Sequence, residues 1–301
     1  MSKQLATKFG EILFKNPVVP ASGTFGFGRE YEAYYDLEKL GGLCSKGLTL
    51  EPKPGNSGIR LWETPAGLMN SIGLENPGID AFIEKEWPHL KELDTVTVVN
   101  VGGKDEESYL QAIEKLNAIE VKLIELNISC PNVKAGGMAY GMKAKTAGDI
   151  TKKVVKLSNH PVMVKLSPNG DSVADIAKAC EESGALGISL INTVQGMAID
   201  YKKKAVVFDN LYAGLSGPAV KPIALRMTHQ VCQAVKIPVM GMGGISTWED
   251  ALEFIMAGAT CIQVGTMNFV NPLAPLDIID GLQAYCEKEG LANIAEVRGI
   301  F

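Results

Sequence analysis

A cysteine stands where an apolar segment gives way to a glycine-containing loop, within residues 122–137 (KLIELNISCPNVKAGG). The apolar run at 123–126 predicts a buried strand, and Pro131 has no N–H with which to continue a hydrogen-bond ladder. A free cysteine is more often a buried apolar residue than a reactive one. Because Cys130 follows the end of a strand and precedes a loop, we expect it to take part in chemistry.

Several predicted strands end in a polar residue that an apolar core would not select. These residues are Lys46, Asn100, Asn127, Lys165 and Asn192, the last followed by Thr193. A single residue of this kind is more often structural, either snorkelling or hydrogen-bonded. Together, at neighbouring strand ends, they predict a polar cup for an anionic, carbonyl-rich ligand, in which Lys46 or Lys165 could stabilise negative charge.

Two glycine-containing segments, 241–244 and 264–266, follow the last two predicted strands. Barrel proteins commonly hold a phosphate at this place with backbone N–H groups and a helix N-terminus. Ser246 with Glu249 predicts a capping box that begins such a helix. Glycines also serve plain turns, but this pattern favours a phosphate-bearing ligand. No G-x-G-x-x-G motif opens a first βαβ unit, so a mononucleotide such as FMN fits better than a Rossmann dinucleotide site.

The elements that must position these residues alternate between short apolar runs and amphipathic helical stretches. The runs lie at 17–21, 43–48, 96–101, 123–128, 162–166, 187–192, 238–242 and 261–265. This pattern predicts an α/β protein, a (β/α)8 TIM barrel whose active site lies at the C-terminal strand ends. Residues 5–14 predict a hairpin that closes the barrel bottom. Long connections at 49–81 and 193–218 predict functional loops at the C-terminal ends.

The composition excludes several classes of function. The 301 residues carry a net charge of −5, which argues against a nucleic-acid partner. The six cysteines contain no C-x-x-C pair, so their spacing predicts neither a metal site nor an iron–sulfur cluster. Cys180, on the apolar face of a helix capped by Ser172, is expected to pack in the core. Without a leader-like or membrane-spanning apolar segment, we expect a cytoplasmic protein that does not enter a membrane.

Longer motifs extend over nearly the whole chain. They are PASGTFGFG at 20–28, SKGLTLEPKPGN at 45–56, GLMNSIGLENPG at 67–78, NISCPN at 127–132, INT at 191–193, GGIS at 243–246 and GT at 265–266. With these motifs the chain resembles the class 1 dihydroorotate dehydrogenases, which are FMN-containing (β/α)8 barrels. The segments GLENPG, GFGRE and GGMAYG make it most similar to class 1B, the catalytic subunit that pairs with an electron-transfer subunit.

The resemblance implies a single FMN-binding barrel domain over residues 1–301 that oxidises (S)-dihydroorotate to orotate in pyrimidine (UMP) biosynthesis. Cys130 would be the base that takes a proton from C5 while a hydride passes from C6 to FMN N5. Electrons would then reach NAD through a partner subunit that carries FAD and a [2Fe–2S] cluster. The assembly implied is a heterotetramer built on a homodimer of catalytic chains.

The resemblance also assigns the other site residues. FMN contacts fall on Ser22, Lys46, Gly47, Asn100, Asn127, Lys165, Ile191, Gly217, Gly243, Gly244, Gly265 and Thr266. Contacts with dihydroorotate or orotate fall on Lys46, Asn70, Ser71, Ile72, Gly73, Leu74, Asn127, Asn192 and Thr193. No metal ligand is implied. The sequence pattern assigns Glu125 no role beyond that of a hydrogen-bonded interior carboxylate. The glycine-rich composition of residues 138–145 suggests a lid.

Three alternatives stay open at the level of sequence. The resemblance also admits a fumarate-dependent class 1A dihydroorotate dehydrogenase or a reductase similar to dihydropyrimidine dehydrogenase. From a different class, a flavin-free barrel could bind a phosphorylated metabolite or act as a lyase. The electron acceptor separates the first two from class 1B, and the colour of the purified protein separates the third.

Overall fold

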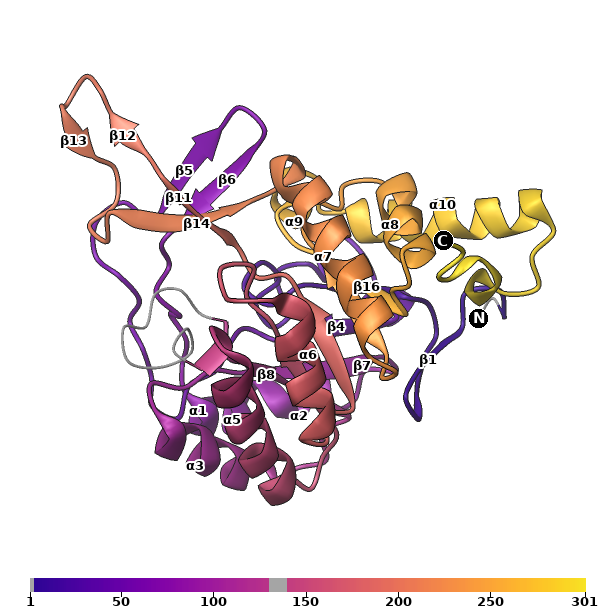
Figure 1. Ribbon diagram of the computed structural model, residues 1–301, viewed down its shortest axis with the longest axis horizontal. Coiled ribbons are helices and arrows are strands. Elements are labelled where there is room, and N and C mark those ends of the chain that lie inside the picture. The colour runs from indigo at the N-terminus through magenta and orange to yellow at the C-terminus, as the bar shows by residue number, and fades with distance from the viewer. Residues whose placement is uncertain (1–2, 130–139) are drawn as a thin grey trace.

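Figure 1 shows a computed structural model of the chain, in which residues 3–129 and 140–301 are described. Cys130 and the first residues of the predicted lid at 138–145 lie outside the described residues. Within the described part, no helix is long and apolar enough to cross a membrane.

Eight parallel strands of the described chain form the central sheet. They are β3 (Val18–Pro20), β4 (Gly42–Cys44), β7 (Val96–Val101), β8 (Leu123–Asn127), β9 (Val162–Lys165), β10 (Gly187–Leu190), β15 (Val239–Met242) and β16 (Cys261–Val264). Their order is β4-β7-β8-β9-β10-β15-β16-β3. The N–H of Gly41, next to β4, donates to the carbonyl of Val18 on β3 at 3.2 Å, so the two end strands of the sheet meet and close the barrel. The close approach requires glycine, because a Cβ on Gly41 would lie 1.9 Å from the Asn16 carbonyl oxygen. The predicted (β/α)8 barrel is confirmed.

Helices surround this barrel (Figure 1). The longer ones are α3 (Glu106–Leu116), α5 (Ala144–Leu157), α6 (Val173–Glu182), α7 (Lys221–Ala234), α8 (Trp248–Met256) and α10 (Ala274–Glu289). Short helical segments are α1 (Ile79–Ala81), α2 (Trp87–Leu90), α9 (Met267–Val270), a π-helical turn (Phe82–Glu86) and 3-10 turns at Leu37–Lys39, Pro218–Val220 and Ile294–Val297. As predicted, Ser172 caps α6 and Cys180 is fully buried.

The start of α8 lies one residue later than the sequence predicts. The capping box is formed by Thr247 and Asp250, so the prediction of Ser246 with Glu249 is wrong. Both pairs have the same spacing and similar side chains, but the shorter Asp250 carboxylate reaches back to two backbone N–H groups, of Ser246 at 2.8 Å and of Thr247 at 3.1 Å.

A short hairpin closes the bottom of the barrel, as predicted. Its strands β1 (Thr7–Phe9) and β2 (Ile12–Phe14) pair antiparallel. Phe9 and Phe14 are fully buried and pack with the apolar side chains that the barrel strands direct inward at this end, among them Val98, Leu123 and Met163. The aromatic side chains fill the end of the barrel that lies opposite the predicted site.

The two long connections contain strands of their own. β5 (Leu61–Thr64) and β6 (Gly67–Asn70) come from the first, and β11 (Val194–Met197) and β14 (Tyr212–Ser216) from the second. They form an antiparallel sheet in the order β11-β14-β6-β5. A small hairpin of β12 (Ile199–Asp200) and β13 (Ala205–Val206) extends it away from the barrel (Figure 1). The predicted functional loops are therefore one folded unit.

Candidate active site

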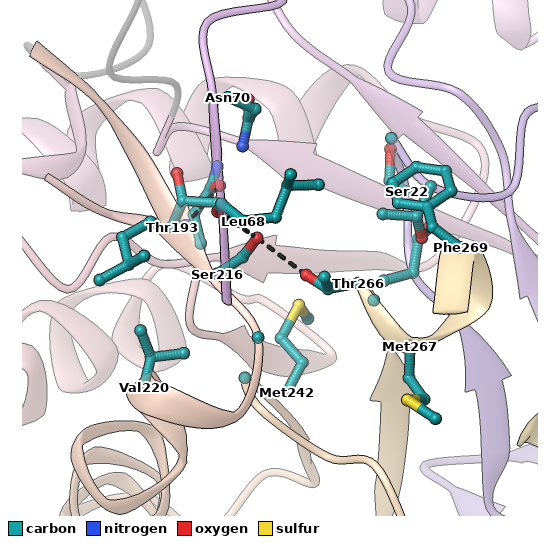
Figure 2. Close-up of a pocket in the computed structure, with 18 of the residues that line it drawn as sticks. Ser22, Leu68, Asn70, Thr193, Ser216, Val220, Met242, Thr266, Met267 and Phe269 are labelled. Carbon is teal, nitrogen blue, oxygen red and sulfur yellow. Dashed lines mark hydrogen bonds between the residues drawn. The ribbon is translucent and has the colours of Figure 1, made fainter. Parts of the chain in front are cut away.

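A cavity of about 350 Å³ lies between the C-terminal ends of the barrel strands and the antiparallel sheet. Its volume falls within the usual range of small-molecule sites. The strand ends contribute polar residues, and the antiparallel sheet contributes Leu61. The same sheet also contributes Leu68 and Asn70, and α9 contributes Met267 and Phe269 (Figure 2). The long connections thus form one wall of the site.

Most of the predicted polar cup is present at this cavity, but Asn100 is fully buried and does not line it. Lys46, Asn127, Lys165, Asn192 and Thr193 all line it. They come from four different strand ends, and Asn127 and Lys165 stand opposite each other in the register of β8 and β9. Asn127 and Lys165 are 6% and 5% exposed, so a ligand here meets donors that are largely shielded from water.

Lys46 and Lys165 are held in different electrostatic surroundings. Burial, the largest influence, lowers the pKa of Lys46 below its ordinary value, while Glu75 raises it and Arg60 lowers it to a smaller extent. The Lys165 ammonium lies 3.7 Å from the carboxylate of Glu125. Lys46 has no such close carboxylate among its described neighbours and is the better placed to pair with an anionic ligand.

Glycine is required at one side of the cavity. Gly217, Gly243 and Gly244 have φ of 97°, 125° and 77°, the region that side chains disfavour. A Cβ on Gly244 would lie 2.7 Å from the backbone nitrogen of Lys221. These residues leave room for a ligand group to approach the backbone closely.

Backbone donors surround the same space. Among the described residues, the N–H groups of Gly244, Gly265 and Thr266 donate to no other protein group. The N–H of Ser246, by contrast, is bound to Asp250, so this part of the predicted anion site at the helix start is occupied by the protein itself. Free N–H groups beside glycines are suited to an oxyanion such as a phosphate.

The residues assigned from the family resemblance divide into two groups by position. Those that line the cavity are Ser22, Lys46, Gly47, Asn70, Ile72, Gly73, Leu74, Asn127, Lys165, Ile191, Asn192, Thr193, Gly217, Gly243, Gly244, Gly265 and Thr266. Asn100 and Ser71 are buried just behind the lining, at 0% and 2% exposure. Ser71 Oγ accepts from Asn56 Nδ2 at 3.1 Å and supports the 70–74 segment. Cys130 lies outside the described residues.

Other lining residues are not identified by sequence reasoning. They include Thr24, Leu68, Ser216, Met242, Met267 and Phe269. Thr266 Oγ1 donates to Ser216 Oγ at 2.8 Å, and Ser216 Oγ donates to the Leu68 carbonyl at 3.1 Å (Figure 2). These contacts connect the start of α9 with β14 and β6. In the sequence, Ser216 is marked only by its position before Gly217 and Pro218. Its place at the cavity depends on the pairing of β14 with β6, in which it lies opposite Leu68.

The fold and the site define a (β/α)8 barrel protein with a cavity whose donors are suited to an anionic, phosphate-bearing ligand. The family model of dihydroorotate dehydrogenase matches residues 4–286. A dihydroorotate dehydrogenase B (NAD(+)) catalytic subunit from Petrotoga mobilis is 53% identical over 289 residues, 96% of each chain. One from Thermoanaerobacter pseudethanolicus is 50% identical over 295 residues, 98% of each chain. The chain belongs to the dihydroorotate dehydrogenase family.

A solved structure supports the fold independently. A dihydroorotate dehydrogenase from Eimeria tenella, crystallised with ferulenol, superposes with a TM-score of 0.81 at 19% identity, covering 98% of this chain and 88% of that one. At this identity the likeness concerns the barrel and not the details of the site.

Proposed function

We propose that this chain oxidises (S)-dihydroorotate to orotate in pyrimidine biosynthesis, as the catalytic subunit of an NAD-linked, class 1B enzyme. The proposal rests on one observation above all. A cavity that combines a polar cup with a glycine-lined oxyanion site is found in a chain about half identical, over nearly its full length, to proteins named as such subunits. The whole chain, residues 1–301, would act as one FMN-binding barrel domain.

FMN fits the residues present. The free N–H groups of Gly244, Gly265 and Thr266 would bind its phosphate, and Gly217 and Gly243 allow the backbone to approach it. Ser22, Gly47, Ile191 and Lys165 line the remaining space, with Asn100 supporting Asn127 from below. When bound, FMN would supply the hydride acceptor that none of the side chains can provide.

The substrate would lie against the polar cup. Lys46 would pair with its carboxylate, and Asn70, Asn127, Asn192 and Thr193 would hydrogen-bond its ring amides and carbonyls. The segment 71–74 would enclose it from the side of the antiparallel sheet. The shielded positions of Asn127 and Lys165 exclude water and hold the donors in place before charge develops.

Proton removal from C5 would fall to Cys130. The support is the motif NISCPN at 127–132, which begins at Asn127 in the cavity wall and continues through the fully buried Ser129. The C5 proton is only moderately acidic, so a positioned base is needed in step with hydride loss from C6.

Electrons must leave the chain through a partner. The sequence contains neither a Rossmann fingerprint nor cysteines with cluster spacing, so a site for NAD has to come from another subunit. We propose that this subunit carries FAD and a [2Fe–2S] cluster, that two copies of each chain form a heterotetramer on a catalytic homodimer, and that the assembly works in the cytoplasm.

Turnover with an artificial acceptor tests the reaction itself. The purified FMN-loaded chain should convert dihydroorotate to orotate with ferricyanide as oxidant. Cys130→Ala should keep the flavin and lower this rate by about two to four decades, the usual span for losing a general base. Full activity of the variant would refute the assignment of Cys130. A colourless chain that takes up no FMN would refute the proposed function.

A further inference from the structure

Glu125 lies at the centre of the barrel and is fully buried. Its carboxylate accepts hydrogen bonds from Ser189 Oγ at 2.7 Å, Gln263 Nε2 at 3.0 Å, Asn100 Nδ2 at 2.5 Å and Cys44 Sγ at 3.3 Å. With Lys165 on β9, these partners bring five other barrel strands to one side chain. Burying a carboxylate has a large desolvation cost, so a buried ion pair is by itself weak evidence that the residue serves to stabilise the fold.

Glu125 does not itself line the cavity, but two of its partners lead to it. Lys165 lines the cavity directly, and Asn100 contacts Asn127, which also lines it. We propose that Glu125 is a positioning residue that sets both the charge balance and the donor and acceptor orientation of the cavity floor. This inference rests on the proposed function, because it concerns how the same site binds flavin and orotate.

The charge balance follows from the pair with Lys165. Burial, the largest influence, raises the pKa of Glu125, but Lys165 and the hydrogen bonds from Ser189, Asn100 and Gln263 together bring it below its ordinary value. The carboxylate is therefore ionised at neutral pH. The negative charge partly offsets the Lys165 ammonium 3.7 Å away, so a ligand beside Lys165 meets a reduced positive field.

The orientation of the amides follows from the same ionisation. An ionised carboxylate only accepts hydrogen bonds, so Asn100 must turn its Nδ2 toward Glu125 and its Oδ1 away. Oδ1 of Asn100 then accepts from Asn127 Nδ2 at 3.3 Å. Asn127 Oδ1 in turn accepts from Ser129 Oγ at 2.9 Å.

The relay ends at a second residue of the cavity wall. Because Ser129 Oγ donates to Asn127, it accepts from Asn192 Nδ2 at 2.9 Å. The orientation of each amide is thus fixed by the one before it, starting at the carboxylate. The neutral amide introduced by Glu125→Gln offers both a donor and an acceptor, so the Asn100 amide could flip and exchange the positions of its Nδ2 and Oδ1.

Two substitutions separate the charge from the packing. Glu125→Gln removes the charge at nearly constant shape, and Glu125→Asp retains it. Cys44→Ala serves as the matched control, because it removes one donor to the same carboxylate and leaves the charge in place. The readouts are the midpoint potential of bound FMN, measured with mediators, and orotate affinity, measured from the flavin spectrum. Neither readout requires turnover.

The expected results are specific to the charge. Glu125→Gln should shift the midpoint potential to more positive values, because loss of a nearby anion favours the more negatively charged reduced flavin. It should also weaken orotate binding by about tenfold, the cost of one misdirected hydrogen bond. Glu125→Asp and Cys44→Ala should stay close to the unaltered chain in potential. Equal potentials in Glu125→Gln and Cys44→Ala would overturn the proposal.

A second variant keeps the test decisive if Glu125→Gln does not fold. Asn100→Ala removes the first amide of the relay and retains the carboxylate, so orotate should bind about tenfold more weakly while the FMN potential shifts less than in Glu125→Gln. Unchanged orotate affinity would refute the relay. Failure of the unaltered chain to bind FMN or orotate would count against the proposed function instead.

Discussion

The half-buried ammonium of Lys46 has a pKa that its surroundings shift, so its charge gives a test by pH. Burial lowers its pKa below the ordinary 10.5, so the positive charge is lost at a lower pH than for an exposed lysine. Orotate is an anion, and its affinity should therefore fall as pH rises through this lowered pKa. Titration of the FMN-loaded chain with orotate at several pH values measures the effect.

Arginine at the same position is the matched control for Lys46. A guanidinium keeps its charge throughout this range, so Lys46→Arg should lose the decline at high pH, whatever its absolute affinity. An identical decline in both proteins would show that another group titrates.

The thiols differ in expected reactivity. Burial raises the pKa of each cysteine that the structure describes, namely Cys44, Cys180, Cys232, Cys261 and Cys286, with values of about 12 for Cys180, Cys232 and Cys261. Because thiolates are the nucleophiles, iodoacetamide at neutral pH should alkylate Cys130 first, and orotate should slow the reaction. Peptide mass spectrometry locates the label, and Cys130→Ala is the control. Faster labelling of Cys44 would contradict this assignment.

At the residue scale, the sequence predicts which side chains gather at the strand ends but not their depth. Asn100 and Asn127 both follow apolar residues near the end of a strand, yet Asn127 lines the cavity and Asn100 lies beneath it. Depth depends on strand stagger in the barrel, which a single sequence does not express. The role inferred for Glu125 likewise requires the five strands that carry its partners, only two of which pair with β8, to be in place.

At the scale of elements, the hairpin at the bottom of the barrel offers a direct stability test. Phe14 is fully buried, whereas Leu13 in the same strand is 59% exposed. Phe14→Ala should lower the free energy of unfolding by about 3–5 kcal/mol through the lost contacts and the cavity left behind. Leu13→Ala should change it by no more than about 0.5 kcal/mol.

Denaturant unfolding of the two hairpin variants measures these differences. The FMN content of both variants should be measured in parallel as a check on the cavity, because the hairpin lies at the opposite end of the barrel. A Phe14→Ala protein as stable as Leu13→Ala would mean that the hairpin does not close the core.

The eight barrel strands are predictable because each is a short apolar run between amphipathic helices. The antiparallel sheet over the site is not, because its strands pair across the two long connections. Leu215, for example, lies opposite Met69 in the register, far away along the chain. The one-residue error at α8 has a local cause, since Ser246 and Thr247 offer equivalent capping patterns and only the position of Asp250 decides between them.

At the scale of the whole molecule, the described residues form the proposed reaction cavity at the C-terminal strand ends, and we propose that the NAD site belongs to a partner subunit. Family membership follows from nearly the full length of the chain. The reaction proposed therefore divides into two halves, reduction of flavin by dihydroorotate within this chain and reoxidation through another subunit.

The visible spectrum of the purified FMN-loaded chain, recorded anaerobically, tests the first half most directly. Dihydroorotate should bleach the flavin absorbance, and NAD alone should fail to restore it until the electron-transfer subunit is added. Recovery with fumarate would instead indicate a class 1A enzyme. A flavin that stays oxidised in the presence of dihydroorotate would contradict the account.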